Sequence, residues 1–265
     1  MTVVAISGAA SGIGAATAEL LGEHGHRVIG IDIRGADVTA DLGTPDGRAH
    51  AVEAVLDACG GRLDGLVTAA GIGPSSTEQG GRLVSINYFG SVALVDGLRP
   101  ALAAAGSSAV VCVSSNSATC QPDWPEELAE ACIDGDEQRA VSIAETQISL
   151  FAYAPAKAAI AWWVRERAHT AEWAGAGIRM NAIAPGLIET PMTIAQRADP
   201  LIGQFIDAFP VPRGTAGRPD EVASVIDFLL SPASSLLYGS VIFADGGTDA
   251  LSRTRDWPAV WKTRT

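Results

Sequence analysis

The sequence predicts an α/β protein with one domain, built on a doubly wound parallel sheet with helices on both faces. Short apolar runs alternate with longer stretches of helical periodicity, which is the pattern of repeated strand–helix units. The apolar runs are nearly continuous, which favours strands buried on both faces over a half-exposed antiparallel sheet. The 265 residues, 48% of them hydrophobic, are enough for one large core, and no linker or repeat divides them.

The strands and helices follow from these runs in chain order. Six apolar runs are predicted as strands: Val3–Ser7, Val28–Asp32, Leu63–Ala69, Ala109–Ser114, Ile178–Ala184 and Ser240–Phe243. Five stretches with helical periodicity are predicted as helices: Ala15–His24, Arg48–Cys59, Leu83–Ala104, Tyr153–Trp173 and Pro219–Leu230. We treat residues 1–265 as a single domain.

Two segments interrupt the alternation. Residues 118–149 are acidic and helix-prone, and they stand where a strand should lead directly into a helix. Residues 189–217 are rich in Pro, Gly and Thr and are too long for an ordinary connection. Because long segments beside the carboxyl ends of strands commonly form pockets, we expect a helical insertion in the first segment and a substrate lid in the second.

Composition restricts the possible partners. The formal net charge of −12 opposes binding to nucleic acid or to anionic membranes, and no apolar run is long enough for a membrane helix. The basic tail Arg253–Arg264 is read as a solvated terminus. The four cysteines lack the spacing of a disulfide scaffold or metal site, the four histidines are scattered, and no basic leader precedes Val3. We therefore expect reduced thiols, no bound metal and a cytoplasmic location.

A glycine-rich turn follows the first predicted strand and opens the first helix. It runs Ser7-Gly8-Ala9-Ala10-Ser11-Gly12-Ile13-Gly14. A pyrophosphate binds to free N–H groups at a helix N-terminus, and a Cβ at the nearest positions would obstruct it. The position of the turn between a first strand and a first helix therefore predicts a Rossmann-like dinucleotide site that includes Gly8, Ser11, Gly12, Ile13 and Gly14.

An acidic residue indicates which dinucleotide binds. Asp32 ends the second predicted strand, where its carboxylate can accept hydrogen bonds from ribose hydroxyls and repel a 2′-phosphate. Arg34 lies nearby and could weaken that exclusion. We expect NAD, with NADP possible but less favoured.

The pair Tyr153 and Lys157 carries the predicted chemistry. The chain has only two lysines, and one of them follows a tyrosine at i+4, on the same helix face. A phenol is a poor base at neutral pH, whereas a neighbouring ammonium, together with a positive nicotinamide ring, would lower its pKa. The pair predicts acid/base catalysis during hydride transfer, provided that Pro155 lies in the first turn of its helix.

Taken together, these motifs resemble those of the short-chain dehydrogenase/reductase family, over nearly the whole chain. The resemblance implies an NAD(P)-dependent oxidoreductase acting on a secondary alcohol or ketone, with Tyr153 as acid/base, Lys157 as its partner and Ser115, the second serine of its pair, binding the reacting oxygen. It also implies that Asn87 holds a water in a proton relay. Further cofactor contacts implied by the family pattern are Asp41, Leu42, Ala70, Gly71, Pro185, Gly186, Ile188 and Thr190.

Three departures from the family pattern narrow the resemblance. The fourth-strand motif reads Thr68-Ala69-Ala70-Gly71, the stretch from Asp32 to Asp41 is short, and Ser115 stands unusually far before Tyr153. Together with several local motifs, these features are similar to a subgroup, the bacterial 3α-hydroxysteroid dehydrogenase/carbonyl reductases. The resemblance implies a hydroxysteroid or bulky ketone as substrate. We also expect a homo-oligomer, a dimer rather than a tetramer, because the insertion lies beside a helix that the family uses for subunit packing.

Three alternatives remain open at this stage. The same fold could serve a nucleotide-sensing or scaffold protein without turnover, although such proteins typically lose one of the four residues Asn87, Ser115, Tyr153 and Lys157. A sugar-nucleotide epimerase would also use the tyrosine–lysine spacing, but usually with a longer C-terminal region. The tail with Trp257 and Trp261 could cover a partner subunit or be disordered.

Overall fold

A parallel seven-stranded sheet forms the centre of the molecule in the computed structural model, which describes residues 2–78, 80–146 and 148–259. Its strand order is β3-β2-β1-β4-β5-β6-β7, and every neighbouring pair is parallel. The strands are β1 Val3–Ser7, β2 Arg27–Asp32, β3 Val38–Thr39, β4 Gly65–Thr68, β5 Ser108–Val113, β6 Ile178–Pro185 and β7 Val241–Ala244. The doubly wound prediction is confirmed, and the two-residue β3 is the one strand absent from the six predicted runs.

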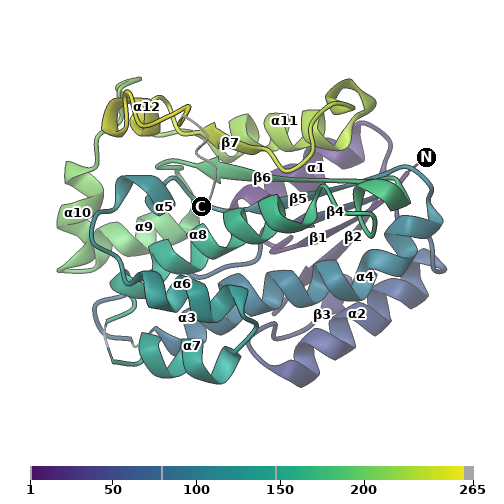
Figure 1. Cartoon of the computed structure of the whole chain (residues 1–265), viewed down its shortest axis with the longest axis horizontal. Coiled ribbons are helices and arrows are strands. Elements are labelled where there is room, and N and C mark those ends of the chain that lie inside the picture. Colours follow the sequence, from purple (N-terminus) through teal and green to yellow (C-terminus); the bar gives the residue numbers. More distant parts are fainter. Residues whose placement is uncertain (1, 79, 147, 260–265) are drawn as a thin grey trace, which may run out of the picture.

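Helices cover both faces of this sheet (Figure 1). On one side lie α1 (Gly12–Glu23) and α11 (Pro219–Leu230), and on the other lie α2 (Pro45–Cys59), α4 (Ser91–Ala104) and α8 (Leu150–Arg167). Alternate strand residues enter two separate cores, so that Leu66 packs toward α2, α4 and α8 whereas Val67 packs toward α1 and α11. Short 3₁₀ turns span Ala174–Ala176 and Pro232–Ser234.

The predicted helix over residues 83–104 is a composite. It begins as α3 (Gly81–Val84), continues through a π-helical segment at Ser85–Gly90 and ends as α4. All six residues of the π segment are buried. Because π segments widen the helix and release backbone groups from their usual partners, they are frequent at functional sites.

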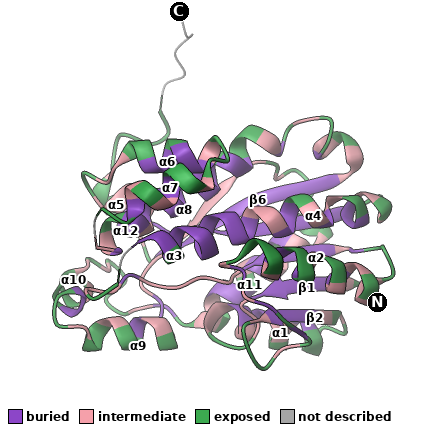
Figure 2. Ribbon diagram, turned by 90° about the horizontal axis from the view of Figure 1, so that it is seen from below, coloured by how far each residue is buried: buried purple, intermediate pink, exposed green. Residues whose placement is uncertain are grey.

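The helix α8 differs from its prediction at both ends. It starts at Leu150 and stops at Arg167, whereas periodicity alone predicted Tyr153–Trp173. The expectation that Pro155 lies in the first turn is wrong, because Pro155 is the sixth residue of the helix and lies just beyond that turn. The helix accommodates it at the cost of one backbone donor, and α8 remains largely buried (Figure 2).

The two irregular segments are helical. Between β5 and α8 stand α5 (Ser117–Cys120), α6 (Glu126–Ile133) and α7 (Glu137–Ala144), of which α6 packs on α8. After β6 come α9 (Pro191–Ala198) and α10 (Ile202–Ala208), which project beyond the carboxyl ends of the strands. The helix α12 (Thr248–Ser252) follows β7. These segments surround the carboxyl ends of the central strands.

The described residues also bear on the expectations for membrane-spanning helices, metal ligands and cysteines. Within them, no helix combines the length and apolarity needed to cross a bilayer, and no three His, Cys, Asp or Glu side chains gather as metal ligands would. All four cysteines are free thiols. Burial raises the pKa of Cys112 and of Cys132 to about 12, which suits structural rather than reactive thiols. Trp261 lies outside the described residues.

Candidate active site

A cavity of about 400 Å³ opens at the carboxyl ends of the strands. It begins at the point where the strand order reverses, between β1 and β4, which is where ligands bind in doubly wound sheets. Most residues predicted for the site line it: Gly8, Ser11, Gly12, Ile13, Asp32, Asp41, Leu42, Ala70, Gly71, Ser115, Tyr153, Lys157, Pro185, Gly186, Ile188 and Thr190. Gly14 and Asn87 are not among its lining residues.

The glycine turn fits a pyrophosphate, and its glycines also have structural reasons of their own. A Cβ on Gly8 would stand 2.8 Å from the Ala69 backbone, and one on Gly14 would stand 2.2 Å from the Gly8 carbonyl oxygen. These two glycines therefore permit close packing of the turn itself. A Cβ on Gly12 would instead face Thr190 across the cavity, at 3.4 Å from its methyl group. Gly12 thus keeps the cradle open.

The N-terminus of α1 leaves its backbone donors available. Ser11 is the N-cap residue, and its side chain makes no capping hydrogen bond. The first N–H groups of a helix lack intrahelical partners, and they point where the dipole is positive. A phosphate oxygen in the cavity would satisfy them, so this chain's residues suit a dinucleotide.

The carboxylate of Asp32 holds nearby backbone and can also bind a ribose. Its carboxylate accepts hydrogen bonds from the Ala10 N–H at 3.0 Å and from the Ile33 N–H at 2.7 Å. Each carboxylate oxygen retains a further lone pair for a ribose hydroxyl. Arg34 is exposed and does not line the cavity, which leaves the negative charge of Asp32 unopposed by that side chain.

Arg82 is a cavity residue that the sequence did not reveal. It donates hydrogen bonds to both carboxylate oxygens of Asp41, at 3.3 and 3.1 Å. The hydrogen bond from the Gly43 N–H is the largest influence and lowers the pKa of Asp41, and the hydrogen bond from Arg82 lowers it further. The two residues are 41 positions apart, so no local spacing could have indicated the pair.

Tyr153 and Lys157 lie on one face of α8 beneath the end of β5. The Lys157 Nζ is 5.9 Å from the centre of the Tyr153 ring and donates a hydrogen bond to the Val113 carbonyl at 2.9 Å. Lys157 is 5% exposed, and burial lowers its pKa to about 8. Burial also raises the pKa of Tyr153, while the Ser115 side chain opposes that rise. Within the chain itself desolvation outweighs the contact with Ser115, and the lowering of the Tyr153 pKa by Lys157 together with the nicotinamide ring stays a prediction.

The two serines at the end of β5 have different partners. The Ser114 hydroxyl donates to the Lys157 carbonyl at 2.7 Å and is thereby engaged in the helix–strand contact. The Ser115 hydroxyl oxygen accepts from the Ser117 N–H at 3.1 Å, which leaves its own hydrogen free to donate. Ser115 therefore suits a group that binds a reacting oxygen, which supports the choice of the second serine.

The side chain of Asn87 is occupied by the backbone. Its Oδ1 accepts from the Ile72 N–H at 2.8 Å, and its Nδ2 donates to the Ile72 carbonyl at 2.9 Å. It therefore fixes the loop after β4 against the π segment. Any part of its side chain in a proton relay falls to the second lone pair of Oδ1 and the second N–H of Nδ2. The fourth-strand motif departs from the family pattern at Thr68, whose buried hydroxyl has no hydrogen-bond partner among the described residues. The loop after β4 is braced by Ser7, whose hydroxyl oxygen accepts a hydrogen bond from the Ala70 N–H at 3.1 Å.

The far wall of the cavity is apolar and comes mainly from the lid segment. Its residues there are Met192, Ile202, Phe205, Ile206 and Phe209, with Gln196 adding a polar group. The sequence located this wall only as a segment, because an irregular stretch does not indicate which side chains turn inward.

Comparisons with known proteins agree with this geometry. Residues 2–124 match the family model described as short chain dehydrogenase, and residues 140–249 match the model described as Enoyl-(Acyl carrier protein) reductase. The chain is 45% identical to the 3-alpha-hydroxysteroid dehydrogenase/carbonyl reductase of Comamonas testosteroni, over 96% of this chain and 98% of that protein. It is 33% identical to the cis-4-hydroxycyclohexanecarboxylate dehydrogenase of Sinomonas cyclohexanicum, over 94% and 97%.

A solved structure gives the same result. The crystal structure of the 3-alpha-hydroxysteroid dehydrogenase from Pseudomonas sp. B-0831, complexed with NADH, superposes with a TM-score of 0.92 at 48% identity. The match covers 97% of this chain and 100% of that one.

Proposed function

This chain belongs to the short-chain dehydrogenase/reductase family and is an oxidoreductase, and from that premise we propose that it interconverts a hydroxysteroid, or a similarly bulky secondary alcohol, and its ketone with NAD(H). One observation carries the proposal: Ser115, Tyr153 and Lys157 line one cavity together with the glycine turn and an apolar lid. That cavity brings an acid/base group, an oxygen-binding hydroxyl and a dinucleotide cradle to the same apolar space.

The residues suggest a division of roles. Bound NAD⁺ would supply the hydride acceptor. In alcohol oxidation, Ser115 donates a hydrogen bond to the reacting oxygen and Tyr153 takes the hydroxyl proton as the hydride leaves the carbon. Lys157 retains donor capacity beyond its bond to the Val113 carbonyl, and it can direct this toward the ribose. Its positive charge, together with that of the oxidised nicotinamide, would oppose the effect of burial on the Tyr153 pKa.

Asp32 supports NAD as the preferred cofactor. A carboxylate beside the ribose repels a 2′-phosphate, and no basic side chain of the glycine turn compensates. The apolar lid supports a bulky apolar substrate. The cytoplasm stays our prediction for the location, in keeping with four free cysteines.

The test is a spectrophotometric assay at 340 nm with NAD and NADP in parallel, across hydroxysteroids and simpler secondary alcohols. We expect steroid turnover with NAD that falls at least about 100-fold in Tyr153→Phe, since general acid–base catalysis typically contributes that much or more. NADH binding should be unaffected in this variant. Turnover of small alcohols alone would reject the steroid, and NADH binding without any turnover would favour a nucleotide-sensing protein.

A further inference from the structure

The short helix α5 depends on other elements for its position. It begins two residues after Ser115, and the residues Asn116, Ser117 and Gln121 at its two ends line the cavity. It has four residues, none of which is buried. Because an isolated turn of helix is unstable, α5 depends on its neighbours for its placement, through packing against α8 and α12 and through hydrogen bonds.

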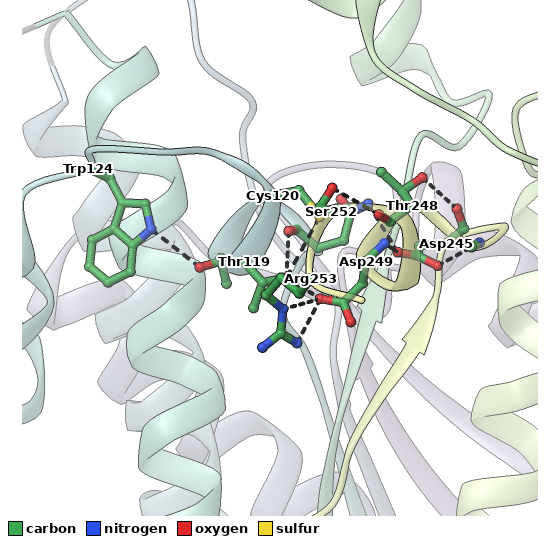
Figure 3. Close-up of polar contacts among 11 residues, drawn as sticks. Thr119, Cys120, Trp124, Asp245, Thr248, Asp249, Ser252 and Arg253 are labelled. Atoms are coloured by element: carbon green, nitrogen blue, oxygen red, sulfur yellow. Dashed lines mark hydrogen bonds and ion pairs between the residues drawn. The ribbon is translucent and has the colours of Figure 1, made fainter. Parts of the chain in front are cut away.

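The C-terminal helix α12 provides the strongest of these bonds (Figure 3). The Thr119 hydroxyl donates to the Asp249 carboxylate at 2.6 Å, across 130 residues of sequence. Asp249 is 7% exposed. Hydrogen bonds to a buried charged acceptor are stronger than those between neutral groups, so this contact fixes α5 firmly to α12.

A second carboxylate connects α12 to the residue beside Ser115. Asp245 accepts hydrogen bonds from the Gly247 N–H at 2.9 Å and the Asp249 N–H at 2.6 Å, which hold the start of α12. The Asn116 side-chain amide reaches the same carboxylate at 3.4 Å. The Asp245 carboxylate, which follows β7, thus connects the start of α12 with Asn116, the residue next to Ser115.

Arg253 neutralises this buried acidic site. Its Nε donates to Asp249 at 2.8 Å, and its guanidinium lies over the rings of Phe243 and Trp257, at 5.5 and 5.9 Å from their centres. The reading of the tail as simply solvated is therefore wrong at Arg253. Buried carboxylates are tolerated when they are paired and hydrogen-bonded, so Arg253 supplies the partner cation of the carboxylate that holds Thr119.

We propose that α12 forms part of the substrate-binding apparatus, with Asp249 as a positioning residue that sets the α5 wall of the pocket through Thr119. The inference rests on the proposed function. It assigns to the C-terminal segment a role in substrate affinity. Cofactor binding should be independent of it, because the glycine turn, Asp32 and Asp41 lie on other elements.

Thr119→Val tests the contact with little change of shape. We expect KM for the alcohol to rise about fivefold, with the Kd of NADH changed less than about twofold, because only the substrate wall is released. Thr170→Val is the matched control, since it removes a hydroxyl that bonds only locally, to the carbonyl of Arg167, the last residue of α8. An unchanged KM in Thr119→Val, or an equal rise in the control, would overturn the inference.

Asp249→Asn, alone and combined with Thr119→Val, tests whether Thr119 affects KM through its bond to Asp249. Because Thr119 acts through Asp249, the KM of the double variant should equal that of the more severe single variant, whereas multiplied effects would contradict the inference. Amide hydrogen exchange provides a readout that needs no turnover: exchange should accelerate at residues 116–121 in Thr119→Val. No acceleration there overturns the inference. Absence of turnover in the unmodified protein would instead contradict the proposed function.

Discussion

Lys157 is an ionisable side chain that the fold buries, which is unfavourable for its charged form. Its Nζ is buried beside the Val113 carbonyl, and burial lowers its pKa to about 8 from a usual value above 10. Such groups oppose folding at neutral pH and are kept for function, where a compact ammonium beside Tyr153 is needed.

The pH dependence of stability follows from that shift. Between about pH 8 and pH 10 the folded chain has released the Lys157 proton while the unfolded chain still holds it, so the free energy of unfolding gains a contribution that grows as pH rises. We therefore expect the Tm difference between the wild type and Lys157→Met to shift in favour of the wild type from pH 7 to pH 10. Thermal unfolding at several pH values measures it, and a difference independent of pH would contradict the lowered pKa.

Asp32 gives a second prediction at this scale, on cofactor choice. In Asp32→Asn the side-chain oxygen can still accept from the Ala10 or Ile33 N–H, but the charge that repels a 2′-phosphate is gone. We expect the ratio of kcat/KM for NADP to that for NAD to rise roughly tenfold, about 1.4 kcal/mol. Arg34→Ala, which alters an exposed residue outside the cavity, is the control. An unchanged ratio in Asp32→Asn would show that selectivity lies elsewhere.

The predictability of the site depends on how far apart its partners stand in the sequence. Tyr153 and Lys157 were identifiable because they share a helix face at a spacing that the chemistry requires. Arg82 with Asp41, and Thr119 with Asp249, were not, because only the tertiary fold brings them together. For Gly8 and Gly14 the structure adds a reason that the sequence did not show, because a Cβ at either position would strike the backbone of the protein itself.

At the scale of elements, an ion pair joins the insertion to the cofactor loop. Arg48 on α2 makes two hydrogen bonds to Glu137 on α7, at 2.7 and 2.6 Å, and donates to the Leu42 carbonyl at 2.8 Å. Burial works against ionisation of Glu137, but the hydrogen bonds from Arg48 outweigh it and lower the pKa. The insertion therefore supports the loop that carries Asp41 and Leu42.

Glu137→Gln tests this support. We expect a loss of about 2 kcal/mol in unfolding free energy, because Arg48 stays buried with a neutral partner, and a weaker affinity for NADH. Chemical denaturation and fluorescence titration measure the two effects. Asp134→Asn is the control on the same insertion, since its pair with Arg139 is longer, at 3.5 Å, and exposed. Equal effects of the two variants would reject a specific role for the Arg48 pair.

The lid is held by a carboxylate at the turn between α9 and α10. One oxygen of Asp199 accepts from the Ser76 N–H at 2.8 Å and the Ser76 hydroxyl at 2.9 Å, while the other caps α10 through the Ile202 N–H at 3.0 Å. These bonds lower the pKa of Asp199 to about 2. The lid is thereby connected to the loop after β4 across the cavity.

Asp199→Ala should release this connection. We expect KM for the alcohol to rise severalfold, because the lid then spends more time away from the substrate, while the Kd of NADH stays the same. Steady-state kinetics measure this, with Asp207→Ala as the control, because Asp207 is an exposed lid carboxylate whose nearest cation, Arg197, is 3.7 Å away. Equal kinetics in the two variants would contradict a latch at Asp199.

At the scale of the whole molecule, the alternation of strands and helices was predictable because it depends on local hydrophobic pattern. The insertion was predictable as helical, but its contacts were not. In the structure α6 packs on α8, and Trp124 from the insertion segment lies 5.8 Å from Trp162 of α8, measured between ring centres. The insertion therefore covers part of α8 with the chain's own residues.

This covering leads to the prediction of a dimer. The part of α8 that α6 covers is unavailable to another subunit, which removes the helix face on which a tetramer of the family would be expected to pack. We expect light scattering coupled to size exclusion to give twice the 27.2 kDa chain mass over a wide range of concentrations. Trp124→Ala uncovers more of Trp162, which is already 39% exposed, without altering the cavity lining, and it should leave this mass unchanged. A tetramer of the unmodified protein would mean that the insertion does not block the second interface.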